Sequence, residues 1–154
     1  MSNMEQFIGV KLVNAKAMTL GEYNTFRGWN LPPDEDASTE GMLVEYVDGG
    51  EANTPEYDNY VSWCPKDVFD RNNRSVTGMS FGMAIEAMKK GFKVARAGWN
   101  GKGMWLVLIR AGNAMSHGFD MQDCIGIKNA QNIMQPGWHS SQLDMLSDDW
   151  QVIV

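Results

Sequence analysis

Two tryptophan-containing segments hold the residues best suited to binding chemistry: VARAGWNGKGM at 94–104 and GWHSSQLDMLSDDW at 137–150. The first segment joins an indole to an amide, a glycine and a cation: Trp99, Asn100, Gly101 and Lys102. The second joins an indole to hydrogen-bonding side chains: Trp138, Ser141, Gln142 and Asp144. A flat indole beside exposed backbone N–H groups and a lysine can hold a nucleotide, with the base on the ring and the phosphates on the amides.

Neither segment places a nucleophile beside a suitable general base, so the residues favour a binding protein over an enzyme. A hydrolase that uses Ser140 or Ser141 with His139 is conceivable. Adjacent residues rarely point at one another, however, and the chain has no Gly-x-Ser-x-Gly elbow. His117 and His139 lack the neighbours of a metal site, and we expect neither a metal nor a cofactor.

Each tryptophan also has a purely structural interpretation. The dipeptide Asn100–Gly101 favours a type I′ hairpin turn, with Trp99 in the core. Trp138 could likewise be a core residue behind Pro136 and Gly137. A hairpin turn also exposes backbone amides, so the two interpretations are compatible for the first segment. Two further tryptophans lie in apolar strand contexts and are predicted to be core residues: Trp105 and Trp150.

Charge is distributed unevenly along the 154 residues, whose net charge is −6. Residues 1–78 carry 6 basic and 13 acidic side chains, a net charge of −7, whereas residues 79–154 carry 7 and 6, a net charge of +1. An acidic chain is a poor match for a long nucleic acid, because such binding rests on Lys and Arg meeting phosphates. A small anion remains compatible, since a basic stretch that includes Arg96 leads into the Trp99 segment.

The composition predicts a cytoplasmic protein. No long apolar run suggests a membrane span, and the N-terminal residues lack the pattern of a signal peptide. The two cysteines, Cys64 and Cys124, have no metal-ligand spacing and are expected to be free thiols in a reducing compartment.

The first half of the chain predicts strands at 7–13, 42–47 and 60–63, with two helices between and after them. Thr19 and Glu22 form a capping box for a helix that should reach Arg27 and stop at Gly28. Pro65 suits the first turn of a helix over 66–72.

The second half predicts a helix capped by Ser80, then strands at 94–96, 104–109, 125–128, 133–135 and 150–154. Residues 111–122 are expected to be loop, and Ser140 or Ser141 should cap a short helical turn that ends at Leu146. These patterns indicate an α+β fold made of small antiparallel sheets, each with packed short helices. Residues 72–78 are the best boundary, which gives an N-terminal region at 1–75 and a second domain at 79–154.

The first half also contains a possible second aromatic–cation site. Its candidates are Arg27, Trp29, Tyr60 and Trp63. A small hydrophobic core is the competing interpretation, and it is the one that we favour.

Four pieces of the second half carry a family resemblance, in this order: MSFGMAIEAMKKG, VARAGWNGKGMWLVLI, IGIKNA and GWHSSQLDMLSDDWQVI. Through them, residues 79–154 resemble the phage family of Thoeris anti-defence sponges of the second type. The resemblance implies an oligomeric α+β protein, a dimer or tetramer. It further implies that the protein sequesters a cyclic ADP-ribose signal in the cytoplasm of the infected bacterial host without cleaving it.

On this interpretation the two tryptophans stack the base, and Lys102 with nearby amides holds the pyrophosphate. Asn100, Gln142 and Asp144 hold the sugars. Three alternatives remain open. The site could bind cyclic dinucleotides, the protein could be an enzyme that degrades the same nucleotides, or residues 1–78 could dock another protein.

Overall fold

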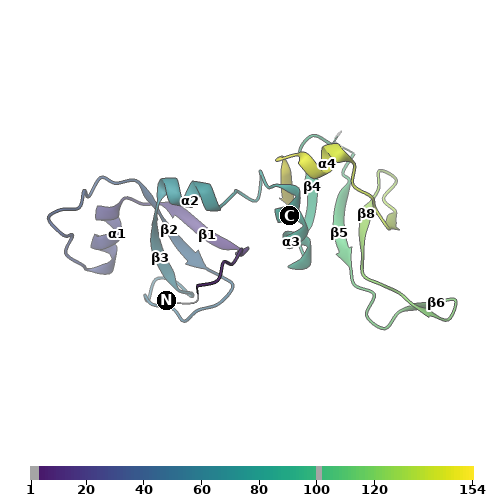
Figure 1. Cartoon of the computed structure of the whole chain (residues 1–154), viewed down its shortest axis with the longest axis horizontal. Helices are drawn as coiled ribbons and strands as arrows, with labels where there is room; N and C mark the ends of the chain where they lie inside the picture. The colour runs from purple at the N-terminus through teal and green to yellow at the C-terminus, as the bar shows by residue number, and fades with distance from the viewer. Residues whose placement is uncertain (1–3, 100–101) are drawn as a thin grey trace. The chain divides into compact units, whose positions relative to one another are not determined.

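The computed structural model describes residues 4–99 and 102–154, and its contacts divide the chain into two compact units, with the boundary between Asn73 and Arg74. Each unit combines an antiparallel sheet with short helices packed on it (Figure 1). The predicted α+β class, with small antiparallel sheets and packed short helices, is therefore confirmed.

The first unit contains a three-stranded sheet of order β1-β2-β3, formed by Val13–Ala17, Gly41–Tyr46 and Val61–Pro65. Helix α1 (Leu20–Arg27) begins at the predicted capping box and ends at Gly28, whose φ of 68° is the left-handed conformation that glycine adopts without strain. Helix α2 (Lys66–Asn72) follows β3 directly. Tyr23, Leu43 and Val61 form the buried centre of this unit.

One strand of the first unit lies later in the sequence than predicted. The apolar segment 7–13 was expected to form it, but strand β1 pairs Val13–Ala17 with Ala17↔Met42 through Val13↔Tyr46. Phe7 and Ile8 are fully or almost fully exposed. The physical reason is register, because β2 offers partners only to residues 13–17, and apolar content alone does not provide a hydrogen-bonding neighbour.

The second unit is a five-stranded antiparallel sheet of order β10-β4-β5-β8-β9. These strands span Trp150–Ile153, Lys93–Arg96, Trp105–Ile109, Cys124–Lys128 and Met134–Pro136. Helix α3 (Phe81–Lys89), capped by Ser80, packs on β10, β4 and β5. The short helix α4 (Gln142–Leu146) precedes β10. Trp150 is fully buried, as predicted, whereas Trp105 is only half-buried and lies beneath the Lys93 ammonium.

The segment 111–122 contains a small two-stranded ribbon where only loop was expected. Strands β6 (Met115–Ser116) and β7 (Phe119–Asp120) pair through a turn at His117 and Gly118, both of which have positive φ. The ribbon projects away from the five-stranded sheet (Figure 1). Two residue pairs are too short to show the alternation that identifies a strand in sequence.

Candidate ligand-binding site

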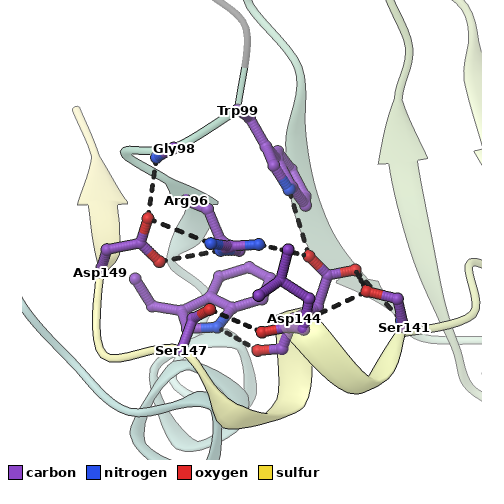
Figure 2. Close-up of polar contacts among 9 residues, drawn as sticks. Arg96, Gly98, Trp99, Ser141, Asp144, Ser147 and Asp149 are labelled. Carbon is purple, nitrogen blue, oxygen red and sulfur yellow. Dashed lines mark hydrogen bonds and ion pairs between the residues drawn. The ribbon is translucent and has the colours of Figure 1, made fainter.

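Arg96 ties together the segments that form the candidate site (Figure 2). Its Nε donates to Asp149 Oδ1 at 2.8 Å, and its Nη1 donates to Asp144 Oδ1 at 3.0 Å. The other oxygen of Asp149 accepts from the backbone N–H of Gly98 at 2.8 Å. One guanidinium therefore links β4 and the turn that follows it to α4 and to the start of β10.

The sheet register brings these groups together. Arg96 is the last residue of β4 and lies opposite Trp150, so its side chain meets the residue that precedes β10. The backbone adds a further bond, from Ala97 N–H to Asp149 C=O at 3.0 Å. The Arg96 side chain is 11% exposed and that of Asp144 is 14% exposed. Charged groups that are this strongly buried need a partner of opposite charge, and Arg96 and Asp144 are partners of one another.

Asp144 also organises helix α4. Its Oδ2 accepts from the N–H and the hydroxyl of Ser141, at 3.1 and 2.8 Å, while Ser141 Oγ accepts from the Asp144 N–H. This reciprocal capping box starts the helix at Ser141 rather than Ser140. The buried indole of Trp150 donates to the Asp144 carbonyl at 2.9 Å and fixes the helix to the core.

Two half-buried indoles, Trp99 and Trp138, form what we call the indole platform. Their centroids are 6.1 Å apart and their planes meet at 61°. Both pack edge-on against Trp150, at 5.4 and 6.2 Å, and the Nε1 of Trp99 reaches Asp144 Oδ1 at 3.4 Å. A base sandwiched between two rings needs the rings to be parallel, and these two planes meet at 61°. The platform therefore offers single ring faces rather than a slot.

The platform's neighbouring segment also presents cations. Lys102 is exposed, as a phosphate ligand would have to be. Lys128, on β8, donates from its Nζ to the carbonyl of Gly103 at 2.8 Å, which fixes a second ammonium next to the residue that follows Lys102. Sequence reasoning missed Lys128, although it lies in the IGIKNA piece of the family pattern.

The structure brings together some of the predicted site residues and leaves others apart. Trp99, Trp138, Asp144 and Ser141 belong to one connected arrangement through the contacts given above. Gln142 is exposed on α4. The predicted contacts of Asn100 and Gly101 lie outside the described residues. Whether these side chains bind a ligand stays a prediction.

Two predicted candidates already have hydrogen-bond partners within the protein. The guanidinium of Arg96, a possible secondary ligand-binding residue in the basic stretch before Trp99, is occupied by two carboxylates. Asp144 was expected to hold a sugar, but both of its carboxylate oxygens already accept hydrogen bonds from the protein. Sequence reasoning missed Asp149. Its position 53 residues from Arg96 gives no local signal, and only strand pairing reveals the contact.

The carboxylates that face Arg96 are held in the charged form. The hydrogen bond from Arg96 lowers the pKa of Asp149, against a smaller opposing effect of burial. For Asp144, burial raises the pKa, but the hydrogen bonds from Arg96, Ser141 and Trp99 together lower it below the ordinary value.

We expect the second unit to lose stability in acid. The folded state binds these protons less readily than the unfolded chain, so the stabilisation is present above the ordinary Asp pKa of about 3.9 and disappears as pH falls through the lowered values. Urea unfolding measured between pH 7 and pH 2 should show this loss. Asp149→Asn should reduce the fall in unfolding free energy at low pH. An unchanged fall in that variant would contradict the role given to Asp149.

The first unit brings together the two residues proposed there as a second site. The Arg27 guanidinium lies 4.3 Å from the centroid of Trp29. Tyr60 and Trp63 line the same cavity, and Trp63 also packs against the buried cluster of this unit, as the core interpretation predicts.

Within residues 4–99 and 102–154, no cluster of three His, Cys, Asp or Glu side chains is placed to hold a metal ion. Over the same ranges, no helix has the length and apolar character needed to cross a membrane. Cys64 and Cys124 are both free.

Comparison with known proteins adds the family. The sequence profile of the Thoeris anti-defense 2-like domain matches residues 79–153, which lie inside the second unit. A protein of Bacillus phage SP01 named Thoeris anti-defense 2 is 38% identical over 88 residues, which cover 50% of this chain and 97% of that protein. Because nearly the whole of that relative is matched, the chain belongs to the Thoeris anti-defense 2-like family.

Proposed function

We propose that the second unit is a sponge, which binds a cyclic ADP-ribose-type second messenger without cleaving it and so blocks TIR-based Thoeris defence. Family membership supports a phage anti-defence role. The observation that carries the proposal is that the family match covers the unit that contains the indole platform together with Lys102 and Lys128. We propose accordingly that the protein acts in the cytoplasm of the infected bacterium, where it would encounter the messenger.

The geometry suggests a division of labour for the messenger. The base stacks on one exposed indole face of the platform, since the angle between the rings leaves no slot. Lys102, Lys128 and the amides of the turn hold the pyrophosphate. Gln142 and Ser141, exposed at the start of α4, face the sugars. Asp144 orients Ser141 and Trp99 and is therefore a positioning residue in this scheme.

The required affinity argues for more than one copy of the chain. A sponge that starves a receptor needs a nanomolar Kd, about −12 kcal/mol. Stacking supplies only about 1–3 kcal/mol per aromatic residue. Charge-assisted bonds and enclosure between protomers would have to supply the remainder.

Exposed apolar side chains support a homo-oligomer, a dimer or tetramer. They lie on α4 and on the segment that contains the edge strand β9: Leu143, Met145, Leu146, Ile133 and Met134. A contiguous patch of exposed apolar side chains commonly marks an interaction surface. Light scattering of the full chain should give a multiple of the 17.2 kDa protomer mass. A monomer at micromolar concentration would contradict this part of the proposal.

We expect Lys102→Met to weaken messenger binding about 10-fold to 150-fold, because a charge-assisted hydrogen bond to phosphate contributes about 1.5–3 kcal/mol. Added salt should reduce the wild-type advantage, and should do so less if the pocket excludes water. Calorimetry at low salt measures the loss. The matched control is Lys89→Met, which removes an exposed lysine paired with Glu86 on α3 and should bind as the wild type does. Equal binding by Lys102→Met and wild type would show that Lys102 points into solvent.

Calorimetric titration of cyclic ADP-ribose isomers into the full chain tests the function itself. The proposal predicts nanomolar binding of at least one isomer, with no heat from continuing turnover after saturation. Binding of cyclic dinucleotides alone would replace the proposed ligand class. Steady turnover heat would replace the sponge with an enzyme.

A further inference from the structure

The first unit contains a cavity of about 790 Å³ that lies outside the family match. It is lined from α1, from the segment after that helix and from β3. Its volume falls within the range of about 300–1,000 Å³ that is usual for small-molecule sites. The first unit therefore has room for a small ligand of its own.

The end of helix α1 creates one wall of this cavity. Gly28 adopts the left-handed conformation, its N–H donates to Thr25 C=O at 3.1 Å, and the Trp29 N–H donates to Asn24 C=O at 2.8 Å. This pair of bonds is a Schellman motif, which reverses the chain direction after a helix. It folds Trp29 back toward Arg27, so that the central carbon of the guanidinium lies over the indole, 4.3 Å from the ring centroid.

The Arg27 guanidinium has N–H donors that are not used within the described residues. Its Nη1 donates to the hydroxyl of the buried Tyr23 at 3.0 Å, which fixes the guanidinium plane. Among the described residues, no carboxylate lies within ion-pair distance of it. The remaining guanidinium N–H groups form a fork that suits a phosphate or carboxylate. Trp29 is 53% exposed and leaves ring surface free for stacking.

Acceptors line the same cavity. Asn24 is 9% exposed, and its Nδ2 donates a hydrogen bond to the Leu20 C=O at 2.9 Å. Its Oδ1 accepts no hydrogen bond from the described residues. The Glu35 carboxylate is a second acceptor on the lining. A ligand that satisfies all of these groups carries an anion, a flat ring and N–H or O–H donors.

We propose that this cavity binds a mononucleotide with an amino-bearing base. Arg27 binds the phosphate, Trp29 stacks the base, and the acceptors of Asn24 and Glu35 receive hydrogen bonds from the amino group and the ribose. The site is separate from the indole platform and does not depend on the function proposed for it.

The test is calorimetric titration of adenosine monophosphate into the full chain at an ionic strength of about 0.15 M, where long-range repulsion by the acidic residues is screened beyond about 8 Å. Arg27→Met should weaken binding at least 10-fold, and Trp29→Leu should weaken it about 5-fold to 150-fold. Trp29→Leu alters an exposed side chain, so it should remain folded even if Arg27→Met does not.

The controls separate the contribution of the phosphate from that of the base, and binding in the first unit from binding in the second. Adenosine should bind at least 10-fold more weakly than the monophosphate and should be insensitive to Arg27→Met. Trp138→Leu, in the other unit, should leave the monophosphate affinity unchanged. Arg71→Met removes an exposed arginine of the same unit and should also have no effect. Absence of binding at millimolar concentration would overturn the proposal, as would wild-type affinity in both Arg27→Met and Trp29→Leu.

Discussion

Arg96→Met should lower the free energy of unfolding of the second unit by about 3–5 kcal/mol, the usual cost of removing one partner from a buried ion pair. The reason is that one guanidinium holds two carboxylates, and methionine would leave both Asp144 and Asp149 without their cation. Hydrogen exchange on peptides from residues 74–154 measures this unit separately from the first.

The matched control for this variant is Arg110→Met. Arg110 also pairs with an aspartate of the second unit, Asp123, at 2.7 Å, but both side chains are well exposed. Exposed pairs contribute about 0–1 kcal/mol, so this control should change stability little. If the two arginine variants were destabilised equally, the buried network would not be what holds α4, β4 and β10 together.

Trp138→Ala should abolish messenger capture. Trp138 is one of the two rings of the platform, and its loss removes both a stacking face and the neighbour that supports Trp99. Each aromatic contributes about 1–3 kcal/mol to base stacking, and the opened platform would lose further contacts. Calorimetry with the messenger measures the loss of affinity.

Because Trp138 also packs against Phe81 and Trp150, alanine could unfold the unit, and a second variant keeps the prediction testable. Trp138→Leu keeps an apolar side chain in the core contact but has no ring. It should fold and bind about 5-fold to 150-fold more weakly. Trp138→Phe, which keeps a ring, should retain most of the affinity. A folded Trp138→Leu that binds as tightly as wild type would make Trp138 a core residue only.

Local signals in the sequence were sufficient to predict the capped helices. Three helices begin at a capping side chain that accepts a hydrogen bond from the backbone N–H three residues later: Thr19, Ser80 and Ser141. Such bonds depend on neighbouring residues alone. The residue pattern likewise predicted most strands of the second sheet. Strand β1 was misplaced because pairing with β2, not apolar content, selects its residues.

The candidate site was predictable only in part, for the same reason. The two indoles and Ser141 could be named as candidates because their residue types alone indicate stacking and hydrogen bonding. That Arg96 and Asp144 would neutralise one another could not be foreseen, since 48 residues separate them in sequence. Asp149 and Lys128 were missed because their roles depend on the order of strands β10, β4, β5 and β8.

The central claim is capture without cleavage, and recovery of the ligand tests it most directly. The full chain is saturated with a cyclic ADP-ribose isomer that it binds, separated from free ligand, and denatured by heat. The released small molecules are then identified by mass spectrometry. The account predicts the intact cyclic molecule, in a constant ratio to protein however long the complex stood before heating. A linear or fragmented product that accumulates with time would contradict the account and would make the protein an enzyme.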